Sequence, residues 1–136
     1  MSESNRRFEL TVLPGFLAIV RLAANEPLPS WATAGDFFSV TRTSDELSVV
    51  CLANQVPPGL AAETAWRALK VHGPFALSEI GVLAALAAAL AHAKVSLFAI
   101  STFDTDYLLV SEKKLDAAIA ALRAAGHSVV DGNAIR

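Results

Sequence analysis

Helix, strand and turn signals follow one another in the stretch HGPFALSEIGVLAALAAALAHAKVSLFAISTFDTDYLLV, residues 72–110. Apolar residues recur at helical spacing in its first part and predict a helix with one apolar face. They are Ile80, Leu83, Leu86, Ala87 and Leu90, and Ser78 precedes them as the expected N-cap. Residues 95–100 and 107–110 predict two buried strands. The segment STFDTD between them is rich in hydrogen-bonding side chains and therefore predicts a polar corner.

A second helix is expected directly after this stretch. Its apolar face has the spacing i, i+3, i+4 and i+7, and it consists of Leu115, Ala118, Ile119 and Leu122. Ser111 is the expected N-cap, and Gly126 suits the C′ position after the last helical turn. Residues 127–130 predict a short closing strand.

A strand is also expected before the first helix, over residues 64–71, so this part of the chain has the order βαββαβ. Because each βαβ crossover must be right-handed, this order predicts an antiparallel sheet with both helices on one face. The expected fold class is α+β, with a ferredoxin-like plan. The apolar strands imply that the N-terminal strands or a second subunit cover the other face of the sheet.

Two hairpins are expected in the N-terminal part of the chain. Residues 8–13 and 16–22 flank a Pro-Gly turn dipeptide and predict the first hairpin. Residues 37–42 and 46–53 are rich in β-branched and aromatic side chains and predict the second.

The segment of residues 54–62 is the expected boundary between two halves of the chain. It contains Pro57, Pro58 and Gly59, which cannot continue either a helix or a central strand. We therefore expect an N-terminal unit over residues 1–60 and a C-terminal unit over residues 61–136.

Composition limits the kind of protein this chain can be. It has 136 residues, of which 54% are apolar and 18% are charged, and this predicts a globular protein rather than a disordered one. No apolar run reaches the ~18 residues of a membrane span and no signal peptide is recognisable, so we expect a cytoplasmic protein without membrane contact. The single cysteine excludes an internal disulfide, and a net charge of −2 without a basic cluster disfavours nucleic acid as a partner.

The residues that usually carry catalysis or bind metals do not form a recognisable site. His72, His92 and His127 have no partners at metal-ligand spacing, so a structural or solvent role is favoured. Cys51 lies in an apolar run and is expected to be a buried thiol. The scattered glycines match no phosphate-binding pattern. We therefore expect no metal, no cofactor and no enzyme activity.

Two features indicate a ligand site, namely the helix start at Ser78 and Glu79 and the STFDTD corner. A helix N-terminus presents unpaired N–H groups that suit a carboxylate or a phosphate. Glu79, Asp104 and Asp106 add negative charge that suits a cationic group on the same ligand. An amino acid carries both groups. The alternative is that the two aspartates only satisfy a solvated turn.

The segment GPFALSEIGVLAALAAALAHAKVSLFAISTFDTDYLLVSEKKLDAAIAAL, residues 73–122, resembles the ACT domain. The resemblance is to small bacterial tandem-ACT proteins and to the ACT units of the eukaryotic cytosolic arginine sensors of the CASTOR type. The upstream segment FFSVTRTSDELSVV, residues 37–50, is similar to the hairpin of their first ACT unit. The resemblance implies a pair of ferredoxin-like ACT units with their sheets side by side, and a ligand held at an interface between ACT units.

The resemblance also implies which residues contact the ligand. Six residues of this chain match ligand-contacting positions of the family: Glu79, Ser96, Leu97, Thr102, Phe103 and Asp106. Of these, residues 102–103 match the corner that wraps the ligand, and residues 96–97 match contacts from a strand edge across the interface. Two positions depart from the sensor pattern, because Ala76 stands where a ligand-contacting glycine occurs and Thr105 stands where an aromatic residue occurs.

Together these observations predict a non-catalytic regulatory protein that binds a small amino acid. A homodimer is expected, since the chain carries a single copy of the motif whose opposed copies frame the ligand in the sensors. Two alternatives remain open at the level of sequence. One is a structural or protein-interaction ACT scaffold with a degenerate pocket, and the other, which is disfavoured, is an enzyme.

Overall fold

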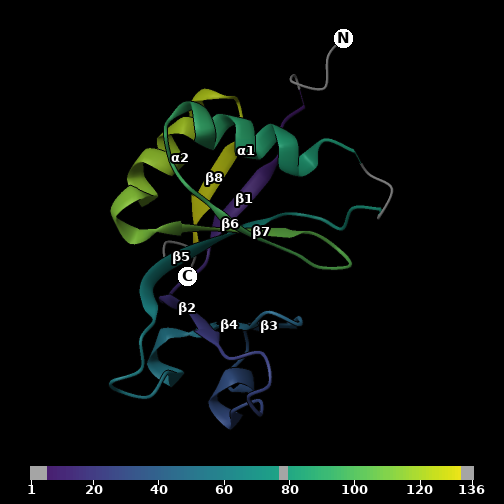
Figure 1. Cartoon of the computed structure of the whole chain (residues 1–136). Helices are drawn as coiled ribbons and strands as arrows, with labels where there is room; N and C mark the ends of the chain where they lie inside the picture. Colours follow the sequence, from purple (N-terminus) through teal and green to yellow (C-terminus); the bar gives the residue numbers. More distant parts are fainter. Residues whose placement is uncertain (1–5, 77–79, 133–136) are drawn as a thin grey trace. The chain divides into compact units, whose positions relative to one another are not determined.

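The computed structural model describes residues 6–76 and 80–132 and consists of two compact units (Figure 1). We call Met1–Pro14 together with Arg67–Arg136 the two-helix unit, and Gly15–Trp66 the strand unit. This division differs from the expected boundary near residue 60. The N-terminal strand β1 (Glu9–Val12) pairs with the end of β5 (Glu63–Val71), and it therefore belongs with the C-terminal elements.

The sheet of the two-helix unit contains β1, the end of β5, β6 (Phe98–Ser101), β7 (Asp106–Ser111) and β8 (Ser128–Asp131). Strands β6 and β7 form an antiparallel hairpin, and β7 also pairs with β5. One pairing differs from the antiparallel plan expected from the sequence, because β1 is antiparallel to β5 but parallel to β8. The reason is that β1 lies between β5 and β8, which the ferredoxin-like plan would place next to each other.

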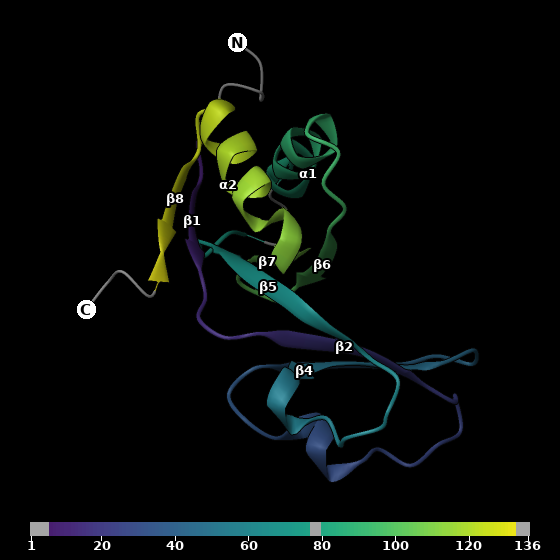
Figure 2. The same ribbon diagram turned by 90° about the vertical axis from the view of Figure 1, so that its left-hand side faces the viewer.

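Two helices, α1 (Val82–His92) and α2 (Leu115–Ala124), lie on the same side of this sheet, as expected (Figure 2). Their inner faces are fully buried at Leu86, Leu90 and Leu122, and these leucines pack with residues of β1, β5 and β7 in one hydrophobic core. Ile119, expected on the buried face of α2, is only half-buried at the edge of this core. The apolar core thus joins both helices to the sheet.

Helix α1 begins later than its apolar pattern predicts. Its N-cap is Gly81, in the left-handed region with φ 89°, and its first residue is Val82. Ile80, expected in the helix, precedes it and is 76% exposed. Ser78, the expected N-cap, lies outside the described residues.

Helix α2 ends where the sequence predicts, and a capped 3₁₀ turn precedes its start. Ser111 Oγ accepts a hydrogen bond from the Lys113 N–H at 3.4 Å, and a 3₁₀ turn (Glu112–Lys114) leads into the helix. Gly126 has φ 101° and its N–H donates to the Arg123 carbonyl at 2.9 Å. Gly126 is therefore the expected C′ residue, and that prediction is confirmed. Ser111 caps the 3₁₀ turn rather than α2 itself, whose N-cap is Lys114.

The strand unit contains β2 (Leu17–Leu22), β3 (Phe38–Arg42), β4 (Leu47–Leu52) and the first residues of β5. Strands β3 and β4 form the second hairpin predicted from the sequence. The first predicted hairpin is wrong: β2 pairs with β4 and with β5, whereas β1 belongs to the other unit. Its Pro-Gly dipeptide is therefore a connection between units rather than a hairpin turn.

Regular helices are confined to the two-helix unit. Residues 15–66, all of which the structure describes, form only the 3₁₀ turns η2 (Ser30–Thr33) and η3 (Ala53–Gln55) beside their strands. The strand unit has its own core, built from β2, β4 and η2: Ala18, Val20, Leu22, Ala32, Leu47, Val49 and Cys51. Of the helices in the described part of the chain, none has the length and hydropathy of a membrane span.

Candidate ligand site

The polar corner predicted from STFDTD is the tip of the β6–β7 hairpin. Strand register pairs Ser101 with Asp106, and the Ser101 hydroxyl donates to Asp106 Oδ1 at 2.5 Å. Between them, the Thr102 N–H donates to the Thr105 carbonyl at 2.8 Å, and Thr102 Oγ1 accepts from the Thr105 N–H at 3.2 Å. The corner is therefore closed by its own side chains and backbone.

Further hydrogen bonds tie this corner to the segment that follows β5. Thr105 is only 7% exposed, and its hydroxyl donates to the Val71 carbonyl at 2.6 Å. The Phe75 N–H donates to the Asp104 carbonyl at 2.7 Å. A Cβ on Gly73 would come within 2.9 Å of that same carbonyl, so a larger residue at this position would push the two segments apart. Hydrogen bonds therefore hold the corner to the segment after β5; the bond from Thr105 is buried, whereas residues 101–104 are exposed.

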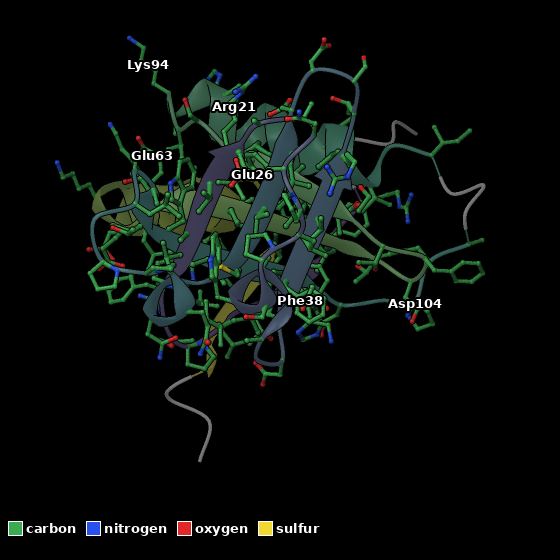
Figure 3. The ribbon with its side chains drawn as sticks, turned by 60° about the horizontal axis from the view of Figure 1, so that its bottom comes forward. Arg21, Glu26, Phe38, Glu63, Lys94 and Asp104 are labelled. Atoms are coloured by element: carbon green, nitrogen blue, oxygen red, sulfur yellow. The ribbon has the colours of Figure 1, made fainter. Side chains whose placement is uncertain are left out.

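A cavity of about 290 Å³ lies between this corner and the start of α1; we call it the corner pocket. Its described lining comes from three segments, residues 75–76, 81–84 and 101–106. Figure 3 shows Asp104 at the outer end of the hairpin. The pocket thus joins a helix start to a polar turn, which are the two features that the sequence singled out.

The charge distribution of the corner pocket is asymmetric. Gly81 has no side chain with which to cap α1, and the first amides of a helix have no intrahelical partner. These amides and the helix dipole place partial positive charge at residues 82–84. Asp104 and Asp106 are the only ionisable side chains among the described lining residues, and they lie on the opposite segment. A site of this kind is complementary to a ligand with a negative and a positive end.

The structure brings together five of the residues predicted for the ligand site. These five line the corner pocket: Ala76, Thr102, Phe103, Asp104 and Asp106. Ser96 and Leu97 do not line it, because they precede β6 at its opposite end; Ser96 is exposed and Leu97 packs against the core. Ser78 and Glu79 lie outside the described residues.

Sequence reasoning missed several lining residues. Gly81 and residues 82–84 line the pocket because α1 begins at Val82, and the available signal was a glycine next to an apolar run. Phe75 also lines the pocket, from the segment after β5. Ser101 was also missed, although four residues separate it from Asp106 in the sequence, a spacing that suits a cross-strand pair at a hairpin tip. Thr105 lines the pocket as well, but its hydroxyl is used to hold the corner against β5.

The remaining candidates for chemistry have structural surroundings. Cys51 is buried, as predicted, and burial raises the pKa of its thiol. His127 is 6% exposed, and its Nδ1 accepts a hydrogen bond from the Phe8 N–H at 3.1 Å. Burial lowers the pKa of this imidazole, and the charge of Arg7 lowers it further. Over residues 6–76 and 80–132, no group of three or more His, Cys, Asp or Glu side chains could hold a metal ion.

Comparison with known proteins bears directly on the family. An ACT domain model matches residues 61–124, and a second model, described as an N-terminal domain, matches residues 15–59. Among curated proteins, none matches this chain. A solved structure of an Agobacterium tumefaciens protein is 40% identical with a TM-score of 0.87, and the alignment covers 93% of this chain and 94% of that one.

More distant solved structures share the fold. A Vibrio cholerae protein, described as of unknown function and a possible transport protein, is 19% identical with a TM-score of 0.71; the alignment covers 87% of this chain and 89% of that one. The regulatory subunit of aspartate kinase from Thermus flavus is 12% identical with a TM-score of 0.58, over 85% of this chain and 95% of that one. The chain therefore belongs to the ACT-domain proteins, a family of generally small-molecule-binding regulatory domains.

Proposed function

We propose that this chain is a non-catalytic regulatory protein that binds a small amino acid in the corner pocket. One observation carries the proposal: the pocket places the uncapped amides of α1 opposite the carboxylates of Asp104 and Asp106. The α-carboxylate of the ligand accepts hydrogen bonds from the amides of residues 82–84. Its ammonium group lies against Asp106, and its side chain contacts Phe75 and Phe103.

The size of the pocket agrees with a small ligand. Its volume of about 290 Å³ is at the lower end of the roughly 300–1,000 Å³ typical of small-molecule sites. The described lining carries two acidic side chains and no basic one, so an amino acid with a second carboxylate would be repelled by Asp104 and Asp106. A neutral or basic amino acid fits this charge pattern better than aspartate or glutamate.

A homodimer forms part of the proposal, with the ligand held at an interface between ACT units of two copies. Two large apolar side chains in this region are each 76% exposed: Phe103, which lines the corner pocket, and Ile80, which directly precedes the lining residue Gly81. Apolar side chains at the mouth of a ligand site suit coverage by a second copy. Ligand binding and assembly are then coupled, because a ligand that contacts both copies favours the assembled state.

An alternative function, that of an ACT scaffold without a ligand, is favoured by one observation. Asp106 already accepts a hydrogen bond from Ser101 at 2.5 Å, so its carboxylate has a partner within its own hairpin. In this alternative the corner is a rigid turn and the protein acts only through its surfaces.

Thermal denaturation in the presence of each standard amino acid separates the two functions. A ligand that binds only the native state stabilises it by RT ln(1 + [L]/Kd), or about 2.7 kcal/mol at a ligand concentration 100 times Kd. We expect at least one neutral or basic amino acid to raise the midpoint, and light scattering on the same sample to give the mass of a dimer. If no amino acid changes the midpoint temperature of unfolding, the scaffold function is favoured.

The Asp106→Asn variant locates the binding site once a ligand is known. Asparagine keeps an oxygen that accepts from Ser101 but removes the charge, and loss of one partner of a desolvated charge pair costs about 2–5 kcal/mol of affinity. Isothermal titration should therefore show no measurable binding. The matched control is Asp116→Asn, an exposed charge in the first turn of α2 that lines no part of the corner pocket. Equal affinities for the two variants would exclude the corner pocket as the site.

A further inference from the structure

The segment before β1 reaches across the two-helix unit to the start of α1. Arg6 Nη1 donates a hydrogen bond to the Ile80 carbonyl at 3.2 Å, although 74 positions separate the two residues in the chain. The guanidinium group of Arg6 also lies over the ring of Phe8, with 4.8 Å between its central carbon and the ring centroid. Arg6 is therefore held by a backbone oxygen and by an aromatic face.

Phe8 connects Arg6 to the other side of the corner pocket. It is 5% exposed and contacts Phe75 edge to face, with 6.0 Å between the ring centroids. Phe75 lines the pocket from the segment after β5, and Ile80 directly precedes Gly81, which lines it at the start of α1. Arg6 and Phe8 thus link two of the three segments that form the pocket, although neither is among its described lining residues.

The residues that lead into α1 are not anchored by their own side chains. Ile80 is 76% exposed, and Gly81 has no side chain to bury. The first buried side chain of the helix belongs to Val82. The hydrogen bond from Arg6 therefore supplies a contact at the point where burial supplies none.

The place of Arg6 is not explained by the stability of α1. The start of a helix carries partial positive charge, which favours an acidic side chain there and disfavours a cation. The guanidinium group nevertheless lies within bonding distance of the residue before the N-cap. This contact is better explained by the placement of the pocket segments than by the helix dipole.

We propose that Arg6 is a positioning residue for the corner pocket, which holds the start of α1 and Phe75 at the separation that a bound amino acid requires. The inference rests on the function proposed above, because it concerns the same pocket. Without the bond from Arg6, Ile80 and Gly81 sample other positions, and only the molecules in the binding-competent arrangement take up the ligand. The apparent affinity falls in proportion to that fraction, although Arg6 does not touch the ligand.

Amide hydrogen exchange tests the positioning without any ligand. The Ala85 N–H donates to the Gly81 carbonyl at 2.9 Å in the first turn of α1, and the Val95 N–H donates at the end of the same helix. Arg6→Met keeps an apolar stem but has no donor. In this variant we expect Ala85 to exchange about three to ten times faster, the worth of one hydrogen bond, and Val95 to be unchanged. Equal exchange of Ala85 in variant and wild type would overturn the proposal.

Isothermal titration with L-leucine and L-lysine, one neutral and one basic amino acid, tests the consequence for binding. Arg6→Met should bind either probe about three to ten times more weakly than the wild type. Arg6→Lys keeps a donor and the charge, so it should recover part of this loss. Arg7→Met is the matched control, because it removes the same charge from the neighbouring exposed position and should leave the affinity unchanged. Urea denaturation checks that every variant is folded during the titration, so that a loss of affinity reports on the pocket.

The outcomes separate this inference from the proposed function. If neither probe binds the wild type, the proposed function fails for these amino acids, and the exchange of Ala85 still decides whether Arg6 holds the start of α1. If the wild type binds a probe and Arg6→Met binds it equally well, the proposal is overturned. It is also overturned if Arg7→Met loses as much affinity as Arg6→Met, because the effect is then one of net charge.

Discussion

The two helices of the ACT unit end in the same way but begin differently. At the end of α1, the Lys94 N–H donates to the Ala91 carbonyl and the Val95 N–H donates to the Leu90 carbonyl, each at 2.9 Å. The end of α2 repeats this pattern, with the N–H groups of residues 126 and 127 bonded to the carbonyls of residues 123 and 122. Both are Schellman motifs, in which the residue at C′ is left-handed.

The starts of the helices differ in how their first amides are satisfied. Ser111 caps the 3₁₀ turn that leads into α2, whereas Gly81 offers no side chain to α1. The uncapped start is the one that lines the corner pocket. The two starts therefore differ in one respect: a serine hydroxyl satisfies an amide of the 3₁₀ turn before α2, whereas no side chain caps the first amides of α1.

The inner faces of the helices should show the largest effects on stability. Leu90→Ala in α1 and Leu122→Ala in α2 each remove a fully buried side chain, so each should lower the free energy of unfolding by about 2–5 kcal/mol. Ile119→Ala should cost less, because Ile119 is half-buried. Chemical denaturation measures all three, with Lys114→Ala as a nearly silent control. If Ile119→Ala costs as much as Leu122→Ala, the burial assigned to α2 is incorrect.

The helix ends differ in the residue at C′, which is Lys94 with φ 62° in α1 and Gly126 with φ 101° in α2. Gly126→Ala should destabilise the protein by about 1–2 kcal/mol, because a Cβ is unfavourable in the left-handed conformation. The cost is one of backbone strain, since the nearest atom to an added Cβ is Arg7 Nε at 3.8 Å. Urea denaturation of this variant and the wild type measures the difference.

The reverse substitution at the end of α1 should change the stability of the protein in the opposite direction. Lys94→Gly relieves the strained backbone but adds freedom to the unfolded chain, so we expect a net gain of roughly 0.5 kcal/mol. The Lys94 side chain extends away from the ribbon, so its removal loses little contact (Figure 3). If Lys94→Gly lowers the stability instead, the contacts of the lysine side chain contribute more than the relief of backbone strain.

The Ser111 cap of the 3₁₀ turn before α2 should contribute less to stability than a well-formed cap. Replacement of a Ser cap by Ala usually costs about 0.5–2 kcal/mol, and the bond from the Lys113 N–H to Ser111 Oγ is long, at 3.4 Å. We therefore expect Ser111→Ala to lie at the lower end of this range in thermal or urea denaturation. Gly81→Ser, at the corresponding position of α1, should not recover this amount, because Gly81 has φ 89°. A stabilised Gly81→Ser protein would contradict the difference between the two helix starts.

The pH dependence of stability tests the end of α2, where His127 follows Gly126. Burial and then Arg7 lower the folded-state pKa of His127, so below its ordinary value of about 6.5 the unfolded chain binds the extra proton first. Stability should be complete above this value and should fall as the pH decreases toward and through the folded pKa. Urea denaturation across this range should show a weaker pH dependence for His127→Asn. An identical dependence in the variant would assign the effect to other groups.

Parts of the fold could be predicted because their signals act over a few residues. Ser111 and Gly126 bound α2 through contacts with the neighbouring backbone, and the polar STFDTD segment forms a hairpin tip closed by its own side chains. The same local signals located four of the twelve described lining residues of the corner pocket: Thr102, Phe103, Asp104 and Asp106. Residues 96–97 were included only through family resemblance, and they lie before β6, away from the pocket.

The tertiary structure decided where distant segments meet. β1 pairs with β5 and β8, although the turn dipeptide after it favours a hairpin, because its apolar residues complete the core beneath α1 and α2. The Thr105 hydroxyl reaches the Val71 carbonyl only after this sheet has formed.

The sequence by itself determined the α+β class, the end of α2 and the polar corner, since each depends on periodicity or on hydrogen bonds within one turn. Tertiary structure decided the place of β1 and the start of α1 at Val82. These depend on side chains far apart in the chain that compete for the same buried volume, and the energy of that competition is absent from any local pattern.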